Sequence, residues 1–442
     1  MLFFDFFLII NEVMQNHKNP TKSFFLLKKS SEPDIGFTTG TCATAASVAA
    51  IRMLLTQKIV PYVTLTTPKG IKVFLEIENQ SFDMDSATCS VQKFSGTDPD
   101  VTNGIKVFAT VRKCTDNQDS KIVTNFQRDC LSDGRAEPFI KITGGKGVGR
   151  VTLPGLDQKP GEAAINSVPR KMIFEGVKRE IEKFLLSRKH PEHEFSLPFG
   201  RLQFEDIENT LPFSIPMSLE VEISVPGGEE IAKQTFNPKL GIVGGISILG
   251  TSGIVEPMSE QALLDTIQVE INVRKAQSFE VLSIVPGNYG ADFLQSEFGF
   301  SVETAVHCSN FVYDSLIMAK NSGFKKILFC GHLGKLVKVA GGIKNTHSKY
   351  GDHRMEIISE VAHDFIPDEQ FSSIYKELSA CISTEQAVKI LDSIDENHRT
   401  RDKIMAEIAR RIRKNMVEWT GGKLEIKVIV FTKEHGLLGE AE

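Results

Sequence analysis

The chain has 442 residues, a length that at roughly 150 residues per domain predicts two or three domains. Hydrophobic residues make up 41% and charged residues 24%, which is ordinary for globular proteins and excludes collagen-like, coiled-coil and wholly disordered chains. Lysine and arginine number 51 against 56 acidic residues, a net charge of −5, and without a block of like charge we expect no nucleic-acid-binding face.

The seven cysteines include no Cys-x-x-Cys pair. We therefore expect reduced thiols, no protein-bound metal and a cytoplasmic protein. The apolar start of the chain is interrupted by Asp5, and its longest unbroken run, Phe6–Ile10, is too short to span a bilayer. We expect no membrane insertion, and residues 1–33 form an N-terminal extension of unknown role.

The first half of the chain predicts mainly strands around two helices. Small residues leading into Ile-Arg-Met-Leu-Leu predict a helix over 41–55 capped by Thr41, and a second helix is expected from about 164 or 170 to 187. The expected strands cover 62–67, 72–78, 106–112, 139–142 and 219–225. Residues 34–245 are thus predicted to form an α+β domain with mainly antiparallel strands. Polar, unpatterned stretches at 114–137 and 189–216 are expected to be surface insertions.

After Gly241 strands and helices alternate. Strands are expected at 279–285, 326–330 and 424–431, and helices at 259–275, 310–321, 354–362, 384–391 and 401–417. This order is typical of a doubly wound, largely parallel sheet, whose ligands lie beyond the carboxyl ends of the strands. Residues 246–442 are therefore predicted to form an α/β, Rossmann-like domain.

Two glycine loops follow apolar strands of this second half, at Pro286–Gly290 and at Gly331–Lys335. Glycine at such a turn lets backbone amides approach a ligand, and the start of the next helix favours negative groups. Together the loops outline one crevice, although each alone could simply close a tight turn. Tyr289 could stack on a purine or a sulfonium, or only pack.

A third glycine string, Gly144–Gly149, contains the spacing of a dinucleotide fingerprint but leads to Pro154 without an intervening helix. We expect a bend between strands that approaches a large ligand. Arg150 and Arg170 beside it could bind carboxylates or serve structural roles.

Three further clusters have both a chemical and a structural interpretation. A helix start at Thr38–Cys42 would attract an anion and lower the pKa of Cys42, so nucleophilic acyl chemistry is conceivable, with a small buried thiol as the alternative. Asp98 and Asp100 either form a turn or steer a proton. His347, Asp352, His353 and Arg354 lack metal-ligand spacing and suggest ligand binding or helix capping.

Eight strings of the chain are distinctive in combination. They are G-F-T-T-G-T-C-A-T-A-A from Gly36, T-D-P-D-V-T from Thr97, G-G-K-G-V-G-R-V-T from Gly144, G-E-A-A-I-N-S-V-P-R-K-M-I from Gly161, T-F-N-P-K-L-G-I-V-G-G-I-S-I-L-G-T-S-G-I-V-E-P-M-S-E from Thr235, P-G-N-Y-G from Pro286, S-N-F from Ser309 and G-H-L-G-K-L-V-K-V-A-G-G from Gly331. These strings resemble the CbiD family, cobalt-precorrin-5B C(1)-methyltransferases of the anaerobic cobalamin (vitamin B12) pathway.

The resemblance implies methyl transfer from S-adenosylmethionine to carbon 1 of cobalt-precorrin-5B, giving cobalt-precorrin-6A, with the cobalt belonging to the substrate. The residues expected to hold the donor are Gly287, Asn288, Tyr289, Gly290, Gly331 and Gly334. Those expected to contact the tetrapyrrole are Thr38, Thr39, Arg150, Arg170, His347 and Arg354. Asp98 or His332 could accept a proton. Homo-oligomers or hand-over to neighbouring pathway enzymes are expected partners, and the alternative function is a non-catalytic tetrapyrrole carrier.

Overall fold

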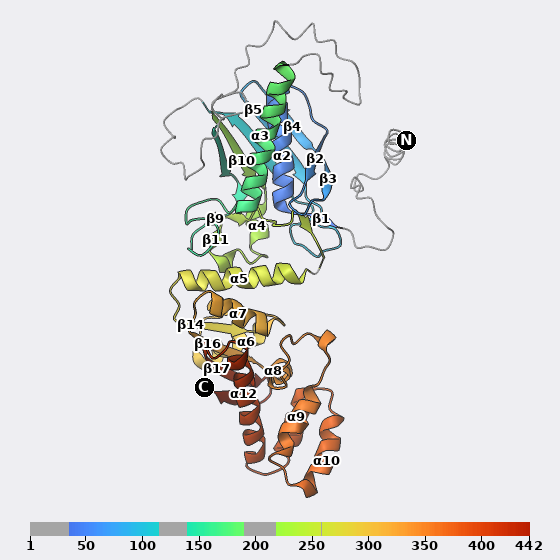
Figure 1. Ribbon diagram of the computed structural model, residues 1–442, viewed down its shortest axis with the longest axis vertical. Coiled ribbons are helices and arrows are strands. Elements are labelled where there is room, and N and C mark those ends of the chain that lie inside the picture. The colour runs from blue at the N-terminus through green and yellow to red at the C-terminus, as the bar shows by residue number, and fades with distance from the viewer. Residues whose placement is uncertain (1–34, 115–138, 190–217, 258) are drawn as a thin grey trace, which may run out of the picture. The chain divides into compact units, whose positions relative to one another are not determined.

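The computed structural model describes residues 35–114, 139–189, 218–257 and 259–442 (Figure 1). The expected extension at 1–33 lies outside the described residues, as do the two expected insertions apart from Cys114 and Lys189. The described residues form two compact units. The first comprises those within 1–152 and 157–258, and the second comprises Leu153–Leu156 and Ser259–Glu442. None of the described helices has the length and apolarity that crossing a membrane requires.

The elements of the first unit are β1 (Gly36–Phe37), α2 (Thr39–Thr56), β2 (Tyr62–Thr66), β3 (Lys72–Glu76), β4 (Glu78–Phe82), β5 (Ser86–Gln92), β6 (Lys106–Lys113), β7 (Phe139–Gly144), β8 (Gly147–Val148), β9 (Arg150–Val151), α3 (Ser167–Lys189), β10 (Ser218–Ser224), α4 (Gly228–Ala232), β11 (Ile242–Val243), β12 (Gly245–Ile246) and β13 (Ile254–Val255). A 3₁₀ turn covers Pro238–Leu240.

A five-stranded sheet in the order β4-β5-β6-β10-β7 organises this unit. Its neighbours are antiparallel except β10 and β7, so the prediction of mainly antiparallel strands is confirmed. The expected strands at 62–67 and 72–78 correspond to β2 and β3, which pair antiparallel as a hairpin. Helices α2 and α3 lie side by side beside the sheet (Figure 1).

Small residues allow α2 to be buried on nearly every side. Its alanines and Cys42 are inaccessible to solvent, and a Cβ atom at Gly176 of α3 would come within 2.8 Å of Val48. Such close helix contact requires small side chains at the crossing point. The predicted cap is wrong by one turn: Thr38, not Thr41, caps α2 and accepts a hydrogen bond from the Thr41 amide at 3.2 Å.

Three short strand pairs join distant parts of the first unit. Strand β12 pairs with β8, β11 with β9, and β13 with β1. The last pairing holds Ile254 and Val255 in the first unit, and the two compact units divide near residue 258.

The elements of the second unit are α5 (Glu260–Ala276), β14 (Val281–Val285), α6 (Asn288–Phe298), β15 (Val306–His307), α7 (Val312–Asn321), β16 (Lys326–His332), α8 (Leu333–Ala340), α9 (Arg354–His363), α10 (Asp368–Ser379), α11 (Thr384–Asp392), α12 (Arg399–Trp419), β17 (Glu425–Thr432) and β18 (Gly436–Ala441). Short 3₁₀ turns cover Val302–Thr304 and Ser348–Tyr350.

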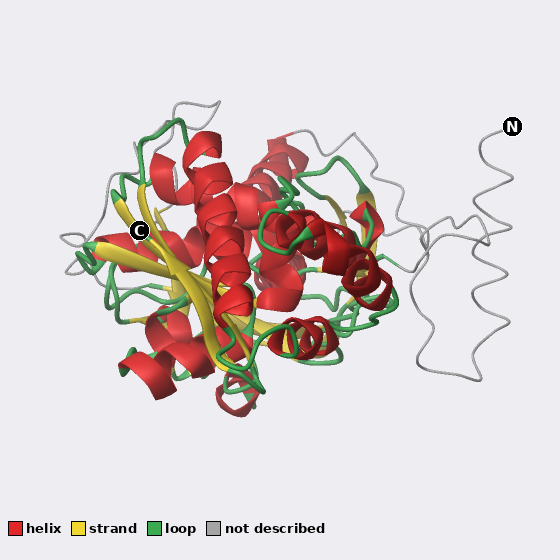
Figure 2. Cartoon of the chain, turned by 90° about the horizontal axis from the view of Figure 1, so that it is seen from below, coloured by secondary structure: helices red, strands yellow, loops and turns green. Residues whose placement is uncertain are grey.

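Its five-stranded sheet has the order β15-β14-β16-β17-β18, and all neighbours are parallel except the last pair. Helix α6 packs through Ala291 and Leu294 on one face of this sheet. Helices α5, α7, α8 and α12 supply apolar side chains to the core on the other face. The strands are therefore enclosed by helices on both sides (Figure 2).

The strand order creates a switch point between β14 and β16. After β14 the chain moves outward to β15, and after β16 it moves the opposite way to β17. In open parallel sheets, ligands bind in the crevice at the carboxyl ends of two such strands. Here those ends are followed by the two glycine loops.

Candidate functional site

The carboxyl ends of three parallel strands meet at the switch point. Gly331 at the end of β16 packs against the residue that follows β14, since a Cβ atom there would lie 3.1 Å from Pro286. Lys335 in the first turn of α8 donates to the Pro286 carbonyl at 3.3 Å and to the Ser309 carbonyl, after β15, at 3.5 Å. The two glycine loops are thus brought together, and Ser309 and Lys335 join them.

The glycines of these loops separate into two kinds. Gly290 and Gly331 are needed for packing, because a Cβ atom at Gly290 would lie 2.9 Å from the Cys330 carbonyl oxygen and one at Gly331 would lie 3.0 Å from Leu336. Gly287 is different: its φ of 177° suits any residue, and a Cβ atom there would meet nothing within 4 Å. The fold does not require this glycine, so its open side is available to a ligand.

His332 is held at both ring nitrogens. As the cap of α8, its Nδ1 accepts a hydrogen bond from the Gly334 amide at 3.1 Å, so the ring proton is on Nε2 and is donated to Glu385 at 2.9 Å. Burial lowers the pKa of His332, with Lys433 acting in the same direction and Glu385 opposing them. The imidazole is therefore neutral near pH 7 and fastens α11 to the second glycine loop.

This arrangement predicts a pH dependence of stability. Because the folded pKa of His332 lies below its ordinary value of 6.5, the unfolded chain binds the extra proton more readily. The contribution of neutral His332 to the free energy of unfolding is therefore complete above about pH 6.5. It declines as the pH falls from that value toward the lower pKa of the folded state. Thermal unfolding of wild type and His332→Asn between about pH 5 and 8 should show a flatter profile for the variant. Parallel profiles would contradict this role.

Tyr289, in the first turn of α6, is 57% exposed and has a cation on its ring. The Lys433 ammonium, which follows β17, lies 3.5 Å from the ring centroid. A second cation on this ring would be repelled by Lys433, so the geometry favours a neutral purine over a sulfonium as the stacking partner. Asn288 beside it is exposed.

In the first unit, Thr38 and Thr39 are buried and their hydroxyls bind within the protein. Thr39 Oγ1 lies 3.3 Å from the Ser247 carbonyl and accepts from the Leu249 amide at 2.9 Å. Gly250 fits against Thr38 so closely that a Cβ atom would approach to 2.3 Å. The two expected substrate residues therefore lock the start of α2 to the loop at 247–253.

The pKa of the Cys42 thiol is shifted in the opposite direction to that expected at a helix start. Its thiol is fully buried, and desolvation raises its pKa to about 12 despite the opposing effect of Lys93. The predicted lowering of the pKa is wrong because burial outweighs the helix terminus. A thiol that is neutral and inaccessible does not suit nucleophilic acyl chemistry.

The two carboxylates of the Asp98–Asp100 turn differ in role. Asp100 forms a 2.5 Å ion pair with the buried Lys93 and accepts from the Thr102 amide at 2.7 Å. Asp98 is half-buried, and its amide donates to the Ser95 carbonyl at 3.3 Å. The turn-forming role thus belongs to Asp100.

The glycine string Gly144–Gly149 packs against the protein's own backbone. A Cβ atom at Gly147 would lie 1.8 Å from the Val225 carbonyl oxygen, and one at Gly149 would lie 2.8 Å from that of Gly245. These contacts account for the string without a ligand. Arg170 donates to the carbonyls of Ile165, Ile142 and Ala163 at 2.8–3.2 Å, which favours its structural alternative. Arg150 is exposed and makes one 3.2 Å bond, to the Gly161 carbonyl.

His347 and Arg354, the other expected substrate residues, lie in the second unit. Exposed His347 caps the 3₁₀ turn at 348–350 by accepting from the Lys349 amide at 3.1 Å. Arg354 forms a bidentate ion pair with Asp352, and this pairing is the main reason why the pKa of Arg354 is raised. His347 therefore has the capping role that the sequence left open, whereas Arg354 is engaged in an ion pair.

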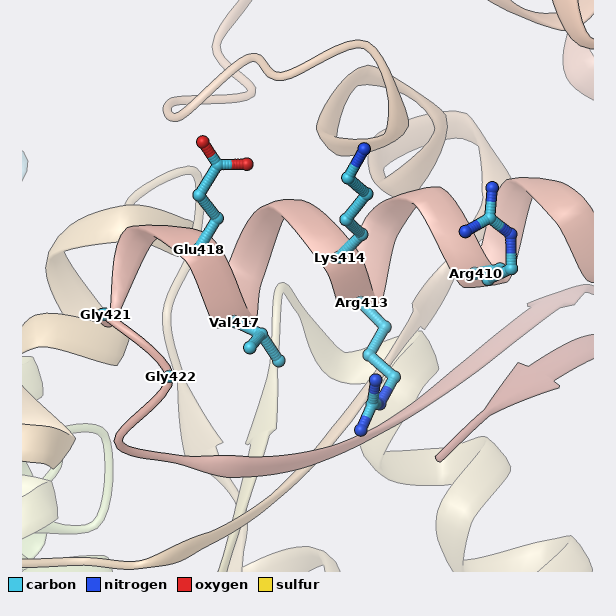
Figure 3. A pocket seen from close by; sticks show the side chains of 7 residues that line it. All are labelled: Arg410, Arg413, Lys414, Val417, Glu418, Gly421 and Gly422. Carbon is cyan, nitrogen blue, oxygen red and sulfur yellow. The ribbon is translucent and has the colours of Figure 1, made fainter.

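A separate hollow of about 550 Å³ lies along α12 and is lined by Arg410, Arg413, Lys414, Val417, Glu418, Gly421 and Gly422 (Figure 3). Arg413 points toward β17, where its Nε donates to the Ile426 carbonyl at 3.0 Å. The hollow lies where β17 begins, at the amino ends of the strands, whereas ligands of parallel sheets bind at the carboxyl ends. This hollow therefore lies away from the strand ends at which the two glycine loops meet.

Lys335 and Glu385 are the site residues that the sequence did not identify. Lys335 is part of the G-H-L-G-K string, in which the glycines predict a ligand-binding loop. Nothing in the sequence shows that the Lys335 ammonium lies between strand ends. Glu385 is 53 residues beyond His332 and carries no local motif. In the described ranges, no three His, Cys, Asp or Glu side chains converge as metal ligands would.

These observations define the class: a protein of two compact units, each with its own sheet, whose second unit carries a candidate small-molecule site at a switch point. The CbiD family model matches residues 27–257, and the model of the CbiD C-terminal domain matches residues 345–442. The chain belongs to the CbiD family, and the resemblance drawn from its strings is confirmed.

Individual relatives agree with the family models. The cobalt-precorrin-5B C(1)-methyltransferase of Ruminiclostridium cellulolyticum is 38% identical over 411 residues, covering 92% of this chain and 91% of that protein. The enzyme of that name from Clostridioides difficile is 35% identical over 413 residues, covering 92% and 94%. The crystal structure of the cobalamin biosynthesis protein CbiD from Archaeoglobus fulgidus is 24% identical, covers 77% of this chain and 87% of that one, and gives a TM-score of 0.34.

Proposed function

We propose that this protein transfers a methyl group from S-adenosylmethionine to carbon 1 of cobalt-precorrin-5B, giving cobalt-precorrin-6A in anaerobic cobalamin biosynthesis. The observation that carries this proposal is the match to methyltransferases of that name over nine-tenths of both chains. A cytoplasmic location, and self-association or hand-over to neighbouring pathway enzymes, belong to the same proposal.

The donor site is proposed to be the switch point of the second unit, acting as a Rossmann-like sheet. The residues there fit the donor, because Gly287 leaves open space beside the first loop and Tyr289 offers an exposed ring to a purine. When bound, S-adenosylmethionine supplies an electrophilic methyl group on a sulfonium. The chain's own task is to hold the donor in line with the acceptor carbon and to exclude water.

The tetrapyrrole is proposed to bind with contributions from the first unit. Arg150 is the expected substrate residue with the greatest freedom to meet a carboxylate, since it is exposed and makes one hydrogen bond. Thr38 and Thr39 support that region by fixing the loop at 247–253. We assign His332 a positioning role, because accepting a proton at Nδ1 would break its bond to Gly334. Asp98 remains the candidate proton acceptor.

The decisive assay incubates the purified protein with cobalt-precorrin-5B and S-adenosylmethionine labelled in the methyl group. We expect label to enter the tetrapyrrole together with an equal amount of S-adenosylhomocysteine. Binding of the pigment without S-adenosylhomocysteine would identify the alternative, a non-catalytic carrier. Omission of the tetrapyrrole provides the control for spontaneous hydrolysis of the donor.

A further inference from the structure

We propose that Lys335 forms a carboxylate subsite that binds the α-carboxylate of the methyl donor. This inference rests on the proposed function and adds to it the group that recognises the amino-acid end of S-adenosylmethionine. Three features of Lys335 support it: its place between strand ends, its lack of a counter-ion among the residues that the structure describes, and the open space at Gly287 beside it.

The position of Lys335 is fixed by three strand ends. It lies in the first turn of α8, directly after β16, and its ammonium donates to one carbonyl after β14 and one after β15. Both bonds are long, at 3.3 and 3.5 Å, and an ammonium group has three protons to donate. A stronger acceptor can therefore be added without displacing the existing partners.

Among the described residues, no carboxylate pairs with Lys335. Its neighbour Cys308 is buried with a pKa raised to about 12, so that thiol is neutral and supplies no negative charge. Burial lowers the pKa of Lys335 itself, which reflects the cost of keeping this cation away from water. The first turn of a helix also disfavours a cation. An incoming anion would relieve both effects.

The next turn of the same helix provides a comparison. Lys338 is buried, whereas Lys335 is half-buried, and the Lys338 ammonium donates at 2.8 Å to the Gly351 carbonyl and at 3.4 Å to that of Thr346, within one loop of the second unit. The Lys338 ammonium is thus hydrogen-bonded within that loop. Lys335 faces the loop of Gly287, where a Cβ atom would meet no neighbour and a ligand has room.

The test compares S-adenosylmethionine with its decarboxylated analogue, using calorimetry on the full chain. The wild type should bind the analogue about 10- to 100-fold more weakly, the range expected for a lost charge-assisted hydrogen bond. Lys335→Met should bind S-adenosylmethionine as weakly as the analogue, with the affinity for the analogue itself changed less than about 3-fold. Lys335→Arg should recover part of the discrimination.

The outcomes separate this inference from the proposed function. If wild type binds both ligands equally, or Lys335→Met still discriminates between them, the carboxylate subsite is refuted while methyl transfer stands. If wild type binds neither ligand, both fail. Because the comparison of ligands on wild type needs no substitution, the inference stays testable even when Lys335→Met does not fold.

Discussion

Gly287→Val should weaken S-adenosylhomocysteine binding by about 100-fold, corresponding to about 3 kcal/mol. The reason is steric: Gly287 has an extended backbone and no neighbour within 4 Å of its Cβ position, so the valine side chain would fill the space proposed for the donor. The cost to folding should be small, about 1 kcal/mol, from valine at a helix cap position. Calorimetric titration measures the affinity, and thermal unfolding measures the stability.

Two matched variants make this result interpretable. Gly287→Ala should give an intermediate loss of affinity, because a methyl group fills less of the same space. Gly290→Ala should instead destabilise the second unit, since its Cβ atom would lie 2.9 Å from the Cys330 carbonyl oxygen. A folded Gly287→Val variant that binds the donor product as well as wild type does would remove the first loop from the site.

Asp100→Ala should lower the free energy of unfolding by about 3–5 kcal/mol, the usual cost of removing one partner from a buried ion pair. The Lys93 side chain is 2% exposed and would remain in the core without its carboxylate. The turn would also lose the hydrogen bonds that Asp100 accepts from Thr102. Chemical denaturation, followed by the transition of the first unit, provides the measurement.

The pH dependence of Asp100 supplies a second readout. Burial opposes the ionised form, but Lys93 and Thr102 outweigh it and hold the pKa below its usual 3.8. The contribution of Asp100 to stability is therefore complete above about pH 4 and is lost as the pH falls through the lower folded pKa, so the stabilities of wild type and Asp100→Asn should converge as the pH falls below about 4. Asp85→Ala is the control from the same unit and should change stability far less, because the Asp85 side chain is 86% exposed. Equal losses from the two substitutions would contradict the structural role of the Lys93–Asp100 pair.

The architecture could be predicted largely from local patterns. Composition predicts helix α2, which is rich in alanine, and runs of apolar residues predict strands β14, β16 and β17. The bounds of these elements agree with the prediction to within a few residues. Strand β4 was missed because Glu-Asn-Gln-Ser-Phe has no apolar alternation. Helix α8 was missed because its first residues were interpreted as part of a glycine loop.

The site was harder to predict because its side chains contact residues that are far away in the sequence. The hydroxyls of Thr38 and Thr39 are expected to be available to a ligand, but Thr38 Oγ1 bonds to Thr41, and Thr39 Oγ1 bonds to Ser247 and Leu249, which lie 208 and 210 residues further along the chain. Lys335 is a second example, because the position of its ammonium between strand ends depends on the order of the strands in the sheet. The glycine patterns predicted which edge of the sheet binds a ligand. The positions of the charged groups at that edge, Lys335 and Glu385, are seen only in the folded structure.

The proposed function depends above all on the methyl donor binding at the carboxyl ends of β14 and β16. A crystal structure of the protein with S-adenosylhomocysteine would locate this ligand. We expect the adenosyl group beside Tyr289, backbone contact at Gly287 and the carboxylate on Lys335. Density for the ligand in the first unit, or in the hollow along α12, would contradict this expectation.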